Sequence, residues 1–171
     1  RGFGIPVVEP LPYFSEMAED FLKGVESIVF VGSKPPVSFF AYPDKRSYLS
    51  PENSKLVQLA TFEQDGKKAL ESLCEMLDAN EISEELLPSE TSQAPLNGEL
   101  NPAHVGLLLG ELLPEEAIVS DEAATSGFLV YPNTWNSKPH DWLSLTGGSI
   151  GQGLPLATGA AIACPDRPVI C

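Results

Sequence analysis

Positive charge is scarce in this chain. Its 171 residues include ten Lys and Arg against 24 Asp and Glu, which gives a formal net charge of −14. Nucleic acids and anionic membrane surfaces are bound through clusters of basic side chains, so this composition argues against both as partners. The excess of acids instead predicts a solvated surface.

Cysteine is also rare, since the chain holds only Cys74, Cys164 and Cys171. Three scattered cysteines make neither a disulfide framework nor a zinc-binding pattern, and they favour a reducing compartment. Long apolar runs are missing too. The longest mostly apolar stretch, residues 154–164, is about half the length of a membrane-spanning helix. We therefore expect no direct membrane insertion.

Apolar residues make up 43% of the chain, and they occur in short runs that alternate with amphipathic segments. Runs with the length and composition of buried strands lie at 27–32, 56–60, 117–121, 142–145 and 169–171. Segments with helical composition lie at 15–23, 65–79, 102–112 and 153–163. This alternation predicts an α/β fold with two partial parallel-sheet modules.

Two polar residues are placed to begin helices. Asp65 and Asn101 each precede a helical segment, and their short side chains can accept hydrogen bonds from N–H groups of the first turn. Pro102 suits a first helical position, where its missing N–H costs nothing. In the helix after Asp65, Cys74 shares the apolar face with three leucines, so we interpret it as a core residue.

A polar stretch at residues 81–100 separates the two modules. It contains acids, Ser, Thr, Pro95 and Gly98 and shows little apolar periodicity, which is typical of an interdomain linker. We therefore divide the chain into a first module at 1–90, a linker at 91–100 and a second module at 101–171.

Four glycines lie within residues 147–153, in the segment "TGGSIGQG" that follows a predicted strand and precedes a predicted helix. Their order differs from both the Rossmann and the Walker patterns. A strand, a glycine loop and a helix form the layout in which backbone groups hold a ligand at the carboxyl end of a parallel strand. A tight turn that needs small residues is the alternative, and spacing alone leaves both interpretations open.

The glycine segment "LTGGSIGQGLPLATGAAIACPDRPVI" resembles the start of the diphosphate-binding (PP) domain of thiamine-diphosphate-dependent enzymes, near the acetolactate synthase large-subunit and benzoylformate decarboxylase groups. "AIVSDEAATSG" resembles the strand and turn before it, and "SIVFVGSKPPVSFFAYPDKRSYLSPE" resembles the later part of the Rossmann-like middle domain. The resemblance implies part of the middle domain at 1–90 and the amino-terminal part of the PP domain at 101–171. It also implies a carboligase or decarboxylase acting on 2-oxo acids.

Roles for two loop residues follow from this resemblance. The family holds thiamine diphosphate in a bent conformation, in which the 4'-amino group of the pyrimidine lies against the thiazolium C2. The Gly148 carbonyl would accept a hydrogen bond from that amino group. The Ile150 side chain would support the bend, and a branched apolar side chain is stiff enough for this purpose.

The resemblance also assigns a turn to the diphosphate. Glu122, Thr125 and Ser126 lie where the family's turn supports this group, and Thr125 is the best candidate donor. Ala123 and Ala124 lack the hydroxyls that some relatives have there.

Other parts of the family's machinery fall outside these residues. The metal-binding Gly-Asp-Gly segment is expected just after Cys171, and the domain with the glutamate that activates the cofactor is expected before Arg1. We therefore assign no catalytic residue and no metal ligand to this chain, and expect it to be inactive alone, with or without bound cofactor. Thiamine diphosphate and Mg²⁺ are expected in the complete protein. His104 is interpreted as a solvated residue in the first turn of a helix, and His140 as a structural packing residue.

Two functions of different classes remain open. The chain is either a portion of a thiamine-diphosphate-dependent enzyme or a non-catalytic structural or linker subunit of a larger assembly. In both cases another protein chain is expected to cover the incomplete modules, in a homo-oligomer or in a host assembly. Because relatives act in bacterial cytoplasm and in organelles, we expect the cytoplasm or an organelle matrix, the plastid stroma included.

Overall fold

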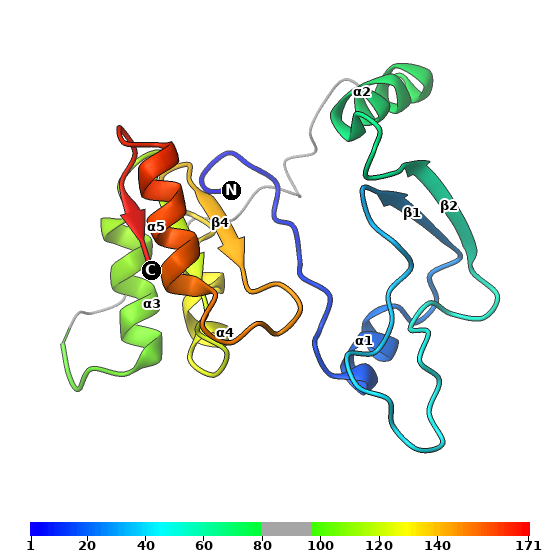
Figure 1. Cartoon of the computed structure of the whole chain (residues 1–171), viewed down its shortest axis with the longest axis horizontal. Coiled ribbons are helices and arrows are strands. Elements are labelled where there is room, and N and C mark those ends of the chain that lie inside the picture. Colours follow the sequence, from blue (N-terminus) through cyan, green and yellow to red (C-terminus); the bar gives the residue numbers. More distant parts are fainter. Residues whose placement is uncertain (80–96) are drawn as a thin grey trace. The chain divides into compact units, whose positions relative to one another are not determined.

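The computed structural model describes residues 1–79 and 97–171. The chain divides into two compact units, Glu9–Glu81 and Arg1–Val8 together with Ile82–Cys171 (Figure 1). Among the described residues, one unit contains a two-stranded sheet and the other a three-stranded sheet, and all strand pairs are parallel. This confirms the predicted α/β class with two partial parallel-sheet modules.

The smaller unit contains two helices and two strands: α1 (Ser15–Phe21), β1 (Ser27–Val31), β2 (Lys55–Ala60) and α2 (Gly66–Leu77). β1 and β2 pair in parallel, and their register shifts once, between Phe30 and Val31. Both strands and both helices lie within two residues of their predicted ends. The connection between β1 and β2 is rich in proline and forms neither helix nor strand, apart from one isolated bridge between Val37 and Tyr48.

The predicted cap of α2 is confirmed. The Lys68 N–H donates to Asp65 Oδ1 at 3.0 Å, and the helix ends at Asp78 in the left-handed conformation with φ of 53°. The predicted core position of Cys74 is wrong, because its side chain is exposed. α2 packs against β2, and no residue of the helix is buried. A two-stranded sheet offers too little surface to cover the apolar face of a helix of this length.

The larger unit holds the remaining elements: α3 (Pro102–Leu112), β3 (Ile118–Asp121), α4 (Gly127–Val130), a 3₁₀ turn η2 (Pro132–Thr134), β4 (Asp141–Ser144), α5 (Gly153–Ala163) and β5 (Val169–Ile170). Within the described chain its sheet has the order β4-β3-β5, with β3 in the centre. The predicted cap of α3 is confirmed, since the His104 N–H donates to Asn101 Oδ1 at 3.0 Å. α4 and η2 were not predicted from the sequence, because they lie in a short segment without apolar periodicity.

Two helices lie on opposite faces of β3. Val119 belongs to a buried cluster with Leu113 and Ala117, and Leu109 of α3 packs against this cluster. The next residue, Ser120, faces the other way and donates its hydroxyl to the Gly153 carbonyl of α5 at 2.9 Å. Because side chains alternate along a strand, α3 and α5 cover the two faces. β3 is therefore buried from both sides.

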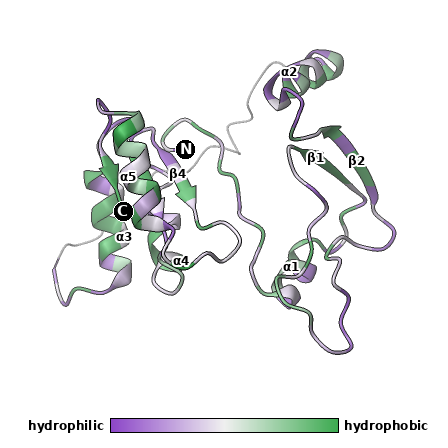
Figure 2. Cartoon of the chain, viewed as in Figure 1, coloured by the Kyte–Doolittle hydropathy of each residue, from purple (hydrophilic) through white to green (hydrophobic). Residues whose placement is uncertain are grey.

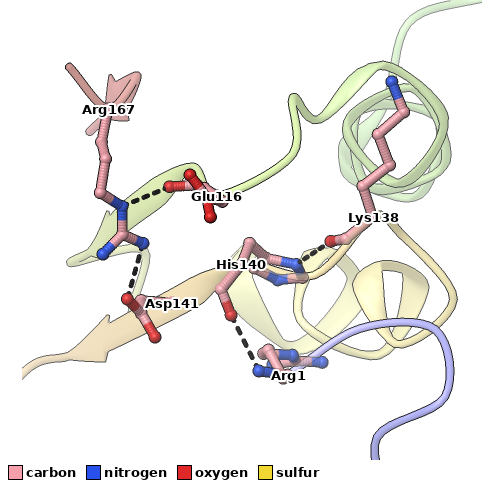
Figure 3. A network of polar contacts seen from close by, with 6 residues as sticks. All are labelled: Arg1, Glu116, Lys138, His140, Asp141 and Arg167. Atoms are coloured by element: carbon pink, nitrogen blue, oxygen red, sulfur yellow. Dashed lines mark hydrogen bonds and ion pairs between the residues drawn. The ribbon is translucent and has the colours of Figure 1, made fainter.

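A polar contact joins the amino ends of the three strands (Figure 3). Arg167, just before β5, donates from Nε to the Glu116 carbonyl at 2.6 Å and from Nη2 to Asp141 Oδ2 at 2.7 Å. Glu116 precedes β3, and Asp141 begins β4. Because the amino ends of these strands lie together, the loops that follow β3 and β4 begin together at the carboxyl ends of the strands.

The first eight residues pack with the larger unit, whereas the sequence predicted one module at 1–90. The Arg1 guanidinium lies over the Tyr131 ring, 3.7 Å from its centre, and donates from Nη2 to the Tyr131 carbonyl at 2.9 Å. Backbone contacts add to this, since the Phe3 N–H donates to the Ser137 carbonyl at 2.8 Å. These contacts join residues more than a hundred positions apart. The predicted linker at 91–100 falls mostly on residues outside the described part of the chain.

α5 is apolar around its circumference, whereas α2 has a polar and an apolar face, as the green and purple residues of Figure 2 show. α5 packs against β3 and β5, and Leu154 and Ile162 are exposed. Helices that are apolar on all sides are usually buried. In the described part of the chain, no helix has both the length and the apolar character to cross a membrane.

Candidate functional site

The glycine loop, residues 146–153, joins β4 to α5 at the carboxyl edge of the three-stranded sheet. Gly147, Gly148 and Gly151 have φ of 59°, 64° and 93°. L-residues rarely adopt these values, so the path of the loop favours glycine at these positions. The φ values support the interpretation of these glycines as residues of a tight turn. Whether the loop also holds a ligand depends on its surroundings.

Side-chain contacts close the base of the loop. The Thr146 N–H and hydroxyl both donate to Gln152 Oε1, at 3.2 and 2.7 Å. Inside the loop, the Ile150 N–H donates to the Gly148 carbonyl at 2.9 Å. A carbonyl oxygen has two lone pairs, so Gly148 can still accept a second hydrogen bond. The Ile150 side chain is 94% exposed at the tip.

The end of β3 anchors the loop from the side. Glu122 accepts hydrogen bonds from the Gly151 N–H and, at 2.6 Å, from the Gly153 N–H. The Gly151 N–H and then the Gly153 N–H hold the pKa of the Glu122 carboxyl below its usual range, because both donors stabilise the charged form. The Ser120 hydroxyl binds the Gly153 carbonyl, so side chains from β3 and its end contact both backbone groups of this glycine.

The turn after β3 is organised around Asp121. This carboxylate accepts hydrogen bonds from the Ala123 N–H at 2.8 Å and from Trp142 Nε1 at 3.1 Å. Thr125 and Ser126 follow in the turn, and Thr125 is exposed. Ser126 precedes α4 without forming a side-chain cap. The Thr125 hydroxyl makes no hydrogen bond with any described residue of the chain.

The predicted site residues therefore lie at the carboxyl ends of two neighbouring strands, β3 and β4. Glu122, just after β3, directly contacts the loop that carries Gly148 and Ile150 after the neighbouring strand β4. Thr125 and Ser126 lie in the turn that follows Glu122. The Glu122 carboxylate faces the loop amides, whereas the resemblance had suggested a role beside the diphosphate. Carboxyl ends of adjacent parallel strands are where α/β sheets bind ligands.

Three further residues organise the site without having been predicted: Ser120, Asp121 and Gln152. The first two lie at the end of the predicted strand at 117–121, where polar residues interrupt an apolar run. That interruption was the available signal. Nothing in the spacing of Gln152 could show that its amide oxygen would reach back to Thr146.

Both histidines have structural surroundings. His140 is buried and lies beside the Trp142 ring. Its Nδ1 donates to the Lys138 carbonyl at 2.8 Å (Figure 3). His104 Nδ1 donates to the Glu99 carbonyl at 2.6 Å, next to the cap of α3. Among the described residues, no group of three or more His, Cys, Asp and Glu side chains could hold a metal ion.

Comparisons with known proteins agree on one group of enzymes. Over 172 aligned positions the chain is 44% identical to IlvX of Mycobacterium tuberculosis, a protein named provisionally as an acetolactate synthase large subunit. The alignment covers the whole chain and 33% of IlvX, so the chain spans about a third of this relative. No family model matches the sequence.

Two solved structures share the fold. A thiamine diphosphate-dependent 4-hydroxybenzoylformate decarboxylase of Rhodococcus jostii RHA1 has a TM-score of 0.65 at 23% identity and covers 93% of the chain. A benzoylformate decarboxylase of Polynucleobacter necessarius has a TM-score of 0.55 at 21% identity and covers 90%. The chain spans 32% of each.

Proposed function

We propose that this chain, a member of the acetolactate synthase-like family of thiamine-diphosphate-dependent enzymes, is the part of its protein that holds the bent cofactor during carboligation or decarboxylation of 2-oxo acids. One observation carries the proposal. Ile150 is almost fully exposed at the tip of a loop that is fixed at its base and from the side. A stiff apolar side chain held in this way is suited to support a ligand.

The residues present fit thiamine diphosphate. The bound cofactor supplies the carbanion-stabilising chemistry of this enzyme class. Gly148 keeps one lone pair on its carbonyl oxygen for a donor on the ligand, and the glycine backbone allows close approach. Ile150 then provides an apolar surface two residues further along. The loop contributes orientation, and no proton transfer is assigned to it.

The turn after β3 is suited to the diphosphate. Thr125 and Ser126 place hydroxyls there, and a hydroxyl can donate a charge-assisted bond to a phosphate oxygen. The two nearby carboxylates, Asp121 and Glu122, are each engaged by N–H donors, which lessens their repulsion of an anion. We attribute the Mg²⁺ ligands to other parts of the complete protein, as the resemblance to the family implies.

Ile150→Ala tests the proposal in the full-length protein, with Ile162→Ala as the matched control. Ile162 is also exposed, but it lies near the far end of α5. We expect Ile150→Ala to lower turnover roughly tenfold to a hundredfold and to change cofactor affinity little, because the side chain acts on geometry. Ile162→Ala should change neither. The measurements are turnover with a 2-oxo acid and titration with thiamine diphosphate and Mg²⁺.

Thr125→Val provides a second arm. Loss of a charge-assisted bond should weaken cofactor binding by about 1.5–3 kcal/mol, which is roughly a tenfold to hundredfold increase in Kd. If the full-length protein binds no thiamine diphosphate with Mg²⁺ present, the proposal is wrong. Equal turnover in the Ile150→Ala and Ile162→Ala variants would show that the glycines serve only the turn.

A structural or linker subunit is the second candidate, and the exposed apolar residues Phe128, Leu129 and Leu154 of the larger unit favour it. Under either function we propose that another protein chain, or another part of the same protein, covers these residues. The mass of the protein as isolated separates the two candidates when it is combined with the cofactor titration. A homo-oligomer that binds the cofactor supports the enzyme, whereas a hetero-assembly without cofactor supports the structural subunit.

The cellular compartment also remains a proposal. Cys74, Cys164 and Cys171 are all free thiols. Free thiols agree with a reducing compartment, and we propose the cytoplasm or an organelle matrix, plastid stroma included.

A further inference from the structure

The Glu122 side chain joins two segments that are far apart in the sequence. Its residue follows β3 directly, and its two carboxylate oxygens accept hydrogen bonds from Gly151 and Gly153, about thirty positions later. Each oxygen has its own donor. The carboxylate therefore fixes the position of the loop backbone with two charge-assisted bonds, which are stronger than bonds between neutral groups.

Gly153 packs closely against both Glu122 and Ser120. A Cβ atom at Gly153 would lie 2.8 Å from Glu122 Oε2 and 3.0 Å from Glu122 Cβ, so any larger residue would displace the carboxylate. On the other side of the same glycine, Ser120 donates to the Gly153 carbonyl at 2.9 Å. Glycine is needed at position 153 because a side chain there would collide with Glu122. Glycine is favoured at position 151 because the backbone φ there is 93°.

The electrostatics favour this arrangement. Gly153 is the first residue of α5, and the amino end of a helix carries a partial positive charge. A carboxylate at this place is stabilised, and it occupies the N–H groups that a bound anion would otherwise use. The side chain thus takes the position that a phosphate has in many glycine loops.

From these contacts we infer that Glu122 is a positioning residue, which holds the glycine loop so that Gly148 and Ile150 keep a fixed place, and that the loop amides of Gly151 and Gly153 are not a phosphate-binding site. The inference deepens the proposed function, on which its cofactor arm rests. It assigns the diphosphate to the turn that contains Thr125 and Ser126 and leaves the loop to the other end of the cofactor.

Hydrogen exchange in the full-length protein tests the inference without any cofactor. Glu122→Gln keeps the shape of the side chain but replaces one acceptor oxygen with an NH₂ group, which would face an N–H donor. We expect the amides of Gly151 and Gly153 to exchange about tenfold faster or more. Glu111→Gln, an exposed position on α3 of the same unit, is the matched control and should leave the loop unchanged. The readout is mass spectrometry or NMR of the loop amides.

Two additional variants guard against a merely disruptive substitution. Gly153→Ala perturbs the same contact from the loop side and should raise exchange in the same residues. Glu122→Asp keeps the charge but is one methylene shorter, so it should restore protection only in part. Unchanged loop exchange in both Glu122→Gln and Gly153→Ala would overturn the inference.

Cofactor measurements distinguish failure of the inference from failure of the proposed function. If Glu122 positions the loop, Glu122→Gln should lower turnover at saturating thiamine diphosphate more than it raises Kd. A rise in Kd that equals that of Thr125→Val, with turnover unchanged, would instead place the diphosphate on the loop and contradict the inference. A protein that binds no thiamine diphosphate, but shows the expected exchange, would overturn the proposed function alone.

Discussion

The strands β3 and β1 have similar apolar sequences but different burial. Ile118, Val119 and Ser120 of β3 are all buried, whereas Phe30 is the buried residue of β1 and Val29 is half exposed. β3 is central in its sheet and has a helix on each face. β1 belongs to a sheet of two described strands, with β2 as its parallel partner, and α2 packs against β2. Burial is therefore set by the layers around a strand and not by its composition.

This difference bears on where the candidate site lies. Glu122 directly follows the strand with two covered faces, and it reaches the glycine loop on the next strand. A side chain can position a loop only if its own backbone is held firmly. The more completely packed unit is thus the one that carries the residues assigned to the cofactor.

The largest expected effect is the difference between truncating a buried leucine of the larger unit and truncating an exposed leucine of the smaller unit. Leu113 is 1% exposed and lies in the cluster with Val119, whereas Leu70 of α2 is 45% exposed. We expect Leu113→Ala to lower the free energy of unfolding by about 2–5 kcal/mol, because it removes contacts and leaves a cavity. Leu70→Ala should cost roughly 1 kcal/mol or less. Denaturant unfolding of the full-length protein measures both.

Hydrogen exchange of peptides from each unit assigns these effects to a unit, because it reports local opening segment by segment. Leu113→Ala should raise exchange in the larger unit, and Leu70→Ala should leave exchange there unchanged. A cost for Leu70→Ala as large as that for Leu113→Ala would mean that the apolar face of α2 is buried in the complete protein.

Local features of the fold were predictable from the sequence. Asp65 and Asn101 cap their helices as expected, because a cap depends on residues within one turn. The strands at 27–32 and 117–121 were found from composition, since an apolar run of this length is sufficient evidence. Caps and apolar runs reveal contacts between residues that are close in the sequence, but they do not reveal contacts between distant segments.

Long-range contacts account for what the sequence did not reveal. Cys74 was interpreted as core because it shares an apolar helix face, but the burial of that face depends on elements elsewhere. Arg1 packs on Tyr131 across most of the chain, and no pattern near Arg1 indicates it. Glu122 was placed near the correct edge, yet its bonds to Gly151 and Gly153 depend on the parallel pairing of β3 with β4.

A smaller effect is expected from the hydroxyl that connects β3 to α5. Ser120 is 2% exposed, so Ser120→Ala leaves the Gly153 carbonyl without its buried donor. We expect a loss of about 0.5–1.5 kcal/mol in the free energy of unfolding and faster exchange at the start of α5. Ser144→Ala, at an exposed position of β4, is the matched control. Equal costs for the two variants would show that α5 does not depend on this contact.

The smallest expected effect is a pH dependence of stability caused by the buried His140. Both histidines of the chain lie in the larger unit, so the smaller unit has no such residue. Burial is the main reason that the pKa of His140 lies below its ordinary value. The hydrogen bond to the Lys138 carbonyl opposes this shift, the charge of Arg1 adds to it, and Asp141 opposes it. Its Nε2 is buried without a hydrogen-bond partner among the described residues, so protonation there would bury a charge.

The direction of this pH dependence follows from proton uptake. As the pH falls below about 6.5, histidine in the unfolded chain binds a proton while His140 in the folded chain resists it. The free energy of unfolding of the larger unit should therefore be constant above that pH and fall progressively towards the folded-state pKa. Denaturant unfolding between pH 8 and pH 5, with hydrogen exchange of peptides from the larger unit, would reveal the slope, and His140→Gln should remove it. If the variant keeps the slope, the loss of stability in acid comes from another group, such as the Glu122 carboxyl, whose pKa is also lowered, and not from the burial of His140.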